Sequence, residues 1–136
     1  MSNALANAEL AVMNLFWDEG RQLTAKEIRE ALYSDGAKNQ HGTVQRLLQR
    51  LEDKGFVERD RSIAVHFFSP LVSREAYASQ QLESLADKLT SGSVAPLISH
   101  LVEHKKISAK EIARIREVLD LHTDRTKASK NHEQGR

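Results

Sequence analysis

The feature that most constrains the fold is a short amphipathic helix that leads directly into strand-forming residues, in the stretch HGTVQRLLQRLEDKGFVERD at positions 41–60. Its apolar residues recur at intervals of three and four and predict one buried helix face, made of Val44, Leu47, Leu48 and Leu51. Gly55 then suits the left-handed conformation that ends many helices. Phe and Val residues follow in 56–60 and 64–69, which predicts a hairpin. The hairpin is therefore expected to brace the helix that precedes it.

Two helices are expected before this segment, and each carries local signals at its ends. The first is capped by Asn7, ends at Gly20 and has an apolar stripe of Leu10, Met13, Phe16 and Trp17. The second begins with a capping box, in which the Thr24 hydroxyl accepts from the Glu27 amide and the Glu27 carboxylate accepts from the Thr24 amide. Its stripe is Ala25, Ile28 and Leu32, and it ends at residues 34–36, Ser-Asp-Gly.

The order helix, helix, helix, hairpin over residues 1–72 predicts a mainly α fold with a small β-hairpin wing, the winged helix-turn-helix. A short polar turn joins the second and third helices, which makes the third the recognition helix that lies in the DNA major groove. Residues 61–63 are expected to connect the two strands, and Pro70 to close the hairpin. A winged helix that binds another protein is the alternative for this domain.

Local charge supports a contact with nucleic acid, although the formal net charge is only +1. No Asp or Glu occurs between Gly36 and Leu51, whereas several basic side chains lie in this stretch. A basic patch of this size matches what phosphate contact requires. The alternative is an ordinary solvated helix face.

The side chains of the third helix suit base and phosphate recognition. Gln45 can pair with adenine, and Arg46 or Arg50 with guanine. Thr43 and the amides at the helix start can bind a phosphate or a base edge. Arginines on the wing are expected to hold phosphates. The predicted DNA-binding residues are Lys38, His41, Thr43, Gln45, Arg46, Arg50, Arg59 and Arg61.

The region 73–122 contains short amphipathic helices without a globular core of their own. Apolar residues from Ala78 to Leu89 recur with the spacing of a heptad repeat. A second capping box starts at Ser108. A second copy of the chain is the expected partner, and packing back onto the first domain is the alternative. The predicted dimerisation residues are Ala78, Leu82, Leu85, Leu89, Val94, Leu97, Ile98, Leu101, Ile112, Ile115 and Leu119. Residues 123–136 are polar and are expected to form a disordered tail.

Most of the chain resembles the penicillinase repressor family, of the BlaI, MecI and CopY type. The matching stretches are AELAVMNLFW, LTAKEIREAL, GTVQRLLQRLEDKGFVERD, HFFSP and SGSVAPLISHLVEHKKISAKEIARIREVLD. The resemblance implies a homodimeric transcriptional repressor that binds a dyad operator in double-stranded DNA, upstream of target genes that often include its own.

The chain departs from that family at three places. Residues 40–42, Gln-His-Gly, replace the usual helix entrance, and Ile63 and Ala64 stand where family wings usually carry Gly-Arg. The Asn-Phe bond that a sensor protease cuts in some members aligns with His100-Leu101. The cysteine-rich metal hook of the copper-responsive branch is absent, because the chain has no cysteine. Neither a protease nor a metal inducer is therefore carried over.

The sequence also contains a short motif that resembles the metal site of an enzyme. His100, Glu103 and His104 fit the H-x-x-E-H pattern of a zinc protease. A zinc enzyme would also require a third ligand and a cleft, and Glu111 and Glu117 are poor candidates because they follow so closely. Ordinary solvated histidines are therefore expected, with no enzyme activity, metal or cofactor, and adventitious or regulatory metal binding is the alternative. No membrane span or signal peptide is visible, which favours the cytoplasm. The alternative function is a winged-helix regulator of the multidrug-repressor type, with a small-molecule pocket beside Tyr77, Leu82 and Leu85.

Overall fold

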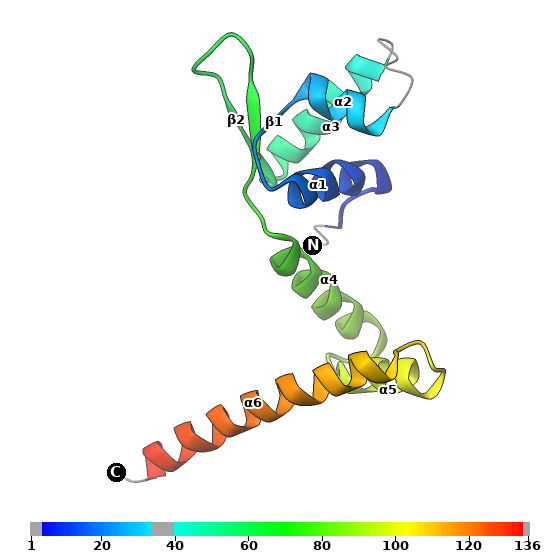
Figure 1. Cartoon of the computed structure of the whole chain (residues 1–136), viewed down its shortest axis with the longest axis vertical. Helices are drawn as coiled ribbons and strands as arrows, with labels where there is room; N and C mark the ends of the chain where they lie inside the picture. Colours follow the sequence, from blue (N-terminus) through cyan, green and yellow to red (C-terminus); the bar gives the residue numbers. More distant parts are fainter. Residues whose placement is uncertain (1–3, 34–39, 135–136) are drawn as a thin grey trace. The chain divides into compact units, whose positions relative to one another are not determined.

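The computed structural model describes residues 4–33 and 40–134, with side chains up to residue 124. The chain divides into two compact units, the first ending at Leu85 and the second beginning at Ala86. Figure 1 follows the chain from the N-terminal unit, in blue to green, into the C-terminal helices, in yellow to red. Within the described residues, no helix combines the length and apolar character that a membrane crossing needs.

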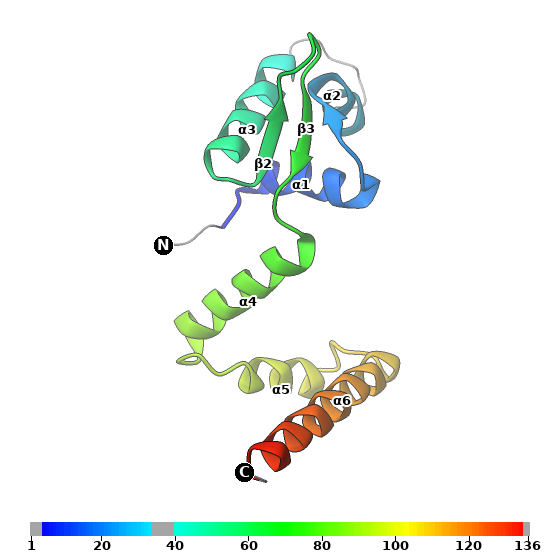
Figure 2. The same cartoon turned by 90° about the vertical axis from the view of Figure 1, so that its left-hand side faces the viewer.

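The first unit contains the three predicted helices, a small sheet that includes the predicted hairpin, and the start of a fourth helix. Its elements are α1 (Asn7–Glu19), β1 (Leu23–Thr24), α2 (Ala25–Leu32), α3 (His41–Asp53), β2 (Val57–Asp60), β3 (Phe67–Pro70) and the start of α4 (Arg74–Leu89). The mainly α class and the winged helix-turn-helix arrangement are thus confirmed. Figure 2 shows the two hairpin strands side by side, with α3 next to β2.

The helix ends follow the local signals, with one exception. Gly20 and Gly55 adopt φ values of 67° and 82°, in the left-handed region that glycine occupies without strain. The box at α2 is complete, since Glu27 N donates to Thr24 Oγ1 at 3.2 Å and Thr24 N donates to Glu27 Oε1 at 3.1 Å. The prediction of Asn7 as the cap of α1 is wrong. Ala6 is the cap residue, and Glu9 accepts its amide at 2.9 Å.

The sheet has three strands in the order β1-β3-β2, all antiparallel. The sequence predicts only the hairpin, because β1 is a two-residue strand whose pairing with Phe67 and Phe68 is long-range. The second hairpin strand begins at Phe67 instead of 64 and includes Pro70, which pairs with Val57. The connection therefore spans residues 61–66 and is longer than the turn predicted at 61–63. It projects beyond the paired strands as the wing (Figure 1).

The core of the first unit joins the predicted stripes of all three helices to the sheet. Its buried members are Val12, Met13, Phe16, Leu23, Ala25, Ile28, Val44, Leu47, Leu48, Leu51, Phe56, Val57, Phe68 and Tyr77. Trp17 is only partly buried, and its indole donates to the Val72 carbonyl at 2.9 Å. The predicted buried face of α3 is confirmed in full, which leaves the opposite face of that helix to solvent.

The first turns of α4 belong to the first unit, and the boundary lies later than the one predicted after residue 72. Tyr77 is buried among Trp17 and Phe56, with ring centroids at 6.1 and 5.7 Å. Its hydroxyl accepts the Leu5 amide at 2.8 Å. Spacing along α4 cannot reveal this attachment, because the partners of Tyr77 lie far away in sequence.

The second unit holds the end of α4, then α5 (Ala95–Glu103) and α6 (Ala109–Gln134). Ser108 Oγ accepts the Glu111 amide at 3.1 Å, as the capping box predicts. The backbone of α6 is helical to Gln134, although the polar sequence predicts a disordered tail from residue 123. Extending an existing helix costs less than starting one, so a polar segment can continue it without its own apolar stripe.

Candidate nucleic-acid interface

The solvent face of α3 carries the predicted contact residues for DNA. Arg46 and Arg50 are exposed, and Thr43 and Gln45 are half-buried at its flanks. Arg46 makes no hydrogen bond or ion pair with the side chains that the structure describes. Its guanidinium is therefore available to an external acceptor. Lys38, also predicted to contact DNA, lies outside the described residues.

The entrance of α3 is held by a polar cluster around His41. The His41 Nδ1 atom lies 3.4 Å from Nη1 of Arg29, and its Nε2 atom lies 3.3 Å from Nε2 of Gln45. Arginine can only donate, so Nδ1 of His41 is the acceptor in this contact. The cluster thus brings Gln45 and Arg29 of α2 close to the start of α3.

Near the end of α3, two acidic side chains accept hydrogen bonds from a glutamine one turn earlier on the same helix. Gln49 donates to Asp53 at 2.9 Å and to Glu52 at 3.4 Å. These contacts occupy the Gln49 amide, which flanks the arginine face. Gln49 is therefore less available to DNA than the exposed Arg46 and Arg50.

Glu52 also links α3 to both predicted wing arginines. Its carboxylate lies 3.8 Å from Nε of Arg59 and 3.3 Å from Nη2 of Arg61. The guanidinium of Arg59 lies 4.7 Å from the centroid of the Phe68 ring, and its side chain is only 15% exposed. Arg61 is 58% exposed. Arg59 thus packs between wing and helix, and its predicted contact with a phosphate stays a prediction.

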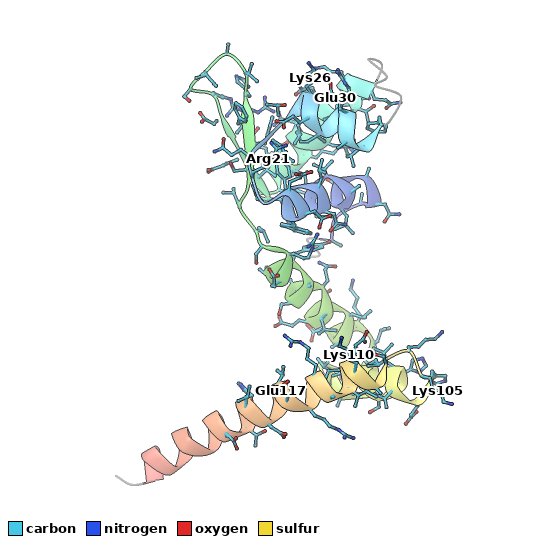
Figure 3. All side chains as sticks on the ribbon, in the orientation of Figure 1. Arg21, Lys26, Glu30, Lys105, Lys110 and Glu117 are labelled. Atoms are coloured by element: carbon cyan, nitrogen blue, oxygen red, sulfur yellow. The ribbon has the colours of Figure 1, made fainter. Side chains whose placement is uncertain are left out.

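A groove of about 540 Å³ lies where the start of α2, the start of α3 and the wing meet. Lys26, His41 and His66 line it together with apolar wing residues. Figure 3 shows Lys26 and Glu30 projecting from α2, four residues apart on one helix. The groove places a cation from α2 beside the predicted recognition helix, a contribution that periodicity along α2 does not predict.

The turn of the wing is stabilised by a local carboxylate. Asp60 accepts the Ser62 amide at 2.9 Å. Hydrogen bonds from the side chain and backbone of Ser62, with the charge of His66, hold the pKa of Asp60 below its usual value. The ionised form is thus favoured, and it fixes the first residues of the loop that leaves β2.

The second unit exposes many apolar side chains that were predicted to dimerise. On α5 no residue is buried, and on α6 Val118, Leu119 and Leu121 are more than half exposed. A shallow hollow of about 340 Å³ lies along α6, lined by Glu111, Arg114, Ile115, Val118 and Leu119. Charged residues such as Lys105, Lys110 and Glu117 project around these helices (Figure 3). Of the predicted set, Ala78, Leu82, Leu85, Leu89, Ile98, Leu101 and Leu119 are exposed, and Val94, Leu97, Ile112 and Ile115 are half-buried.

The histidine pair of α5 has no further ligand partner within the described part of the chain. The rings of His100 and His104 stack with centroids 4.0 Å apart, and Nδ1 of His104 lies 2.9 Å from the His100 carbonyl oxygen. No group of three potential metal ligands occurs among the described residues. Of the residues expected to line a small-molecule pocket, Tyr77 is buried with its hydroxyl hydrogen-bonded to the Leu5 amide, whereas Leu82 and Leu85 are exposed.

Comparisons with known proteins agree with this arrangement. The penicillinase repressor of Bacillus licheniformis is 24% identical over 90% of this chain and 94% of its own length. The transcriptional regulator BlaI of Mycobacterium tuberculosis is 32% identical over 85% of this chain and 82% of its own. The methicillin resistance regulatory protein MecI of Staphylococcus aureus is 25% identical over 85% of this chain and 93% of its own length. The model of the penicillinase repressor family matches residues 5–121. The chain therefore belongs to the penicillinase repressor family of DNA-binding transcriptional repressors.

Proposed function

We propose that this protein represses transcription as a homodimer that places α3 of each copy in the major groove of a dyad operator. The observation that carries the proposal is the division of α3 into two faces. Its apolar face is buried in the first unit, and Arg46 and Arg50 stand on the exposed side. An exposed helix face of this kind, beside a wing, suits base readout in the major groove.

The proposed base contacts are those of Gln45, Arg46 and Arg50, with Thr43 at the helix start. Lys26 and the groove beside it are proposed to meet the sugar-phosphate backbone, which positions the protein without reading sequence. His41 supports the entrance through its contacts with Arg29 and Gln45. Location in the cytoplasm and absence of enzyme activity stay predictions.

Dimerisation is proposed to occur through the second unit. Isolated surface leucines are common on monomers, but a run of exposed apolar side chains over α5 and α6 favours an interface. A second copy can cover the same surface symmetrically. Two recognition helices would then be spaced about one turn of DNA apart, roughly 34–36 Å.

The test is selection of bound duplexes from a random DNA pool at moderate salt. An enriched inverted repeat, with half-sites about 10 base pairs apart, is the expected result. Salt-sensitive binding with no enriched motif would mean phosphate contact alone. Absence of any DNA binding would contradict the proposal and favour a protein-binding winged helix.

A further inference from the structure

We propose that Glu52 is an electrostatic restraint on the wing, which keeps Arg59 and Arg61 out of phosphate contact when the protein binds DNA. The proposal rests on the function proposed above and concerns one of its parts. Sequence position alone assigns both arginines to the sugar-phosphate backbone. Their contacts in the folded chain point instead to a fixed pairing with an acid on the recognition helix.

The geometry of Arg61 supports this pairing. Its Nη2 atom lies 3.4 Å from Oε1 and 3.3 Å from Oε2 of Glu52, so the guanidinium faces both oxygens of the carboxylate. An exposed pair of this type is weak when it stands alone. Here it is part of a network, because the same carboxylate also lies near Arg59 and accepts from Gln49.

Arg59 holds the other end of the network in place. Its side chain is mostly buried against Phe68, which is itself 2% exposed and belongs to the core. A guanidinium fixed in this way cannot turn toward DNA without leaving the Phe68 ring. Nε of Arg59, which makes no hydrogen bond with the described residues, lies 3.8 Å from the Glu52 carboxylate, so we expect its charge to keep Glu52 beside the wing when Arg61 moves.

Transfer of Arg61 to a phosphate has an electrostatic cost for the same reason. Glu52, whose side chain is 20% exposed, would lose a close cation while the polyanionic backbone came near. Like charges brought together at an interface oppose binding. The wing arginines are thus balanced by an acid in the free protein, and we expect them to stay balanced on DNA.

The experiment compares full-length Glu52→Gln with the matched control Asp53→Asn, which removes the same charge one residue later. The probes are the duplex enriched from the random pool and a scrambled duplex of the same composition, each titrated at several salt concentrations. Glu52→Gln is expected to raise the affinity for both duplexes about three- to tenfold near 0.1 M salt. It should also steepen the salt dependence by about one phosphate contact.

The gain must depend on Arg61. In the double variant Glu52→Gln with Arg61→Gln it should disappear, whereas any gain from Asp53→Asn should be the same with or without Arg61→Gln. A gain that survives the loss of Arg61, or that Asp53→Asn reproduces, would mean simple relief of repulsion and would overturn the proposal. Thermal unfolding of each variant separates these effects from a loss of folding.

Arg61→Gln alone provides a test that does not require Glu52→Gln to fold. The restraint predicts no change in the salt slope, because Arg61 makes no phosphate contact in the original protein. A slope that falls by about one contact would overturn the proposal. Failure of the unsubstituted protein to bind either duplex is a different result, since it would contradict the proposed function itself.

Discussion

The Nζ atom of Lys54 lies 2.9 and 3.0 Å from the two carboxylate oxygens of Glu9, and this contact joins the end of α3 to the start of α1. Glu9 is 2% exposed, whereas the Lys54 side chain is 42% exposed and reaches it from the surface. The carboxylate also accepts the amide of Ala6. One buried acid thus caps the first helix and anchors the recognition helix.

Replacing Glu9 with glutamine is expected to lower the free energy of unfolding by about 1–3 kcal/mol. The change removes charge-assisted hydrogen bonds in a buried position while keeping the side-chain shape. Urea denaturation measures the effect. Glu19→Gln is the matched control on the same helix, because its 3.9 Å pair with Arg21 is exposed and should contribute less than about 0.5 kcal/mol. Equal losses in the two variants would contradict this role for Glu9.

Stability should fall with pH in the acid range, and Glu9 should account for part of the loss. Burial raises the pKa of Glu9, but the hydrogen bonds and charge of Lys54, the Ala6 amide and the charge of Arg50 together bring it below its ordinary value of 4.5. A lowered folded-state pKa stabilises the protein above the unfolded-state pKa, and this stabilisation is lost as the pH falls through the folded-state value. Urea titrations from pH 7 downward should show the difference between the original protein and Glu9→Gln shrinking below about pH 4.5. A constant difference would show that Glu9 does not titrate in this way.

Arg46→Ala should weaken operator binding by about 1–3 kcal/mol and relax the preference at one base pair, if its guanidinium pairs with guanine. Repeating the pool selection with the variant shows which position loses information. Lys26→Ala is the comparison, since a phosphate contact should weaken all duplexes alike and lower the salt slope by about one. Unchanged operator affinity in Arg46→Ala would place the readout elsewhere on α3.

A charge in the exposed apolar surface of α6 should separate the dimer. Leu119→Glu places a carboxylate where a partner helix is expected, so sedimentation should show monomers and operator affinity should drop. Leu71→Glu is the control, because Leu71 is similarly exposed, at 54% against 59%, but belongs to the first unit. A stable dimer in the Leu119 variant would exclude this part of α6 from the interface.

Truncation should distinguish the predicted domain boundary from the one in the folded chain. A fragment ending at Leu85 retains Tyr77 and its contacts with Trp17 and Phe56, so it should unfold cooperatively. A fragment ending at Val72 loses this buried ring and should be less stable by several kcal/mol, about what deletion of a large aromatic side chain costs. Thermal unfolding followed by circular dichroism compares the two. Equal melting temperatures would show that α4 is dispensable to the first unit.

The features that the sequence determined are local ones. The capping box at Thr24, the glycine stops at Gly20 and Gly55, and the stripe from Val44 to Leu51 each depend on residues within one or two helical turns. Such signals act through hydrogen bonds and side-chain spacing along one element. They were sufficient to predict the helix order, the hairpin and the exposed arginines of α3.

Only the tertiary structure decided what those side chains contact. The strand at Leu23 forms by pairing with Phe68, and Tyr77 brings α4 into the first core. Glu9 meets a lysine 45 residues away, and Glu52 meets the wing arginines once the hairpin folds back onto α3. The sequence shows where basic residues lie along the chain. Whether each is paired with an acidic side chain depends on contacts that form only when the chain folds. That is why the sequence alone does not reveal that the wing arginines lie beside Glu52 in the folded chain.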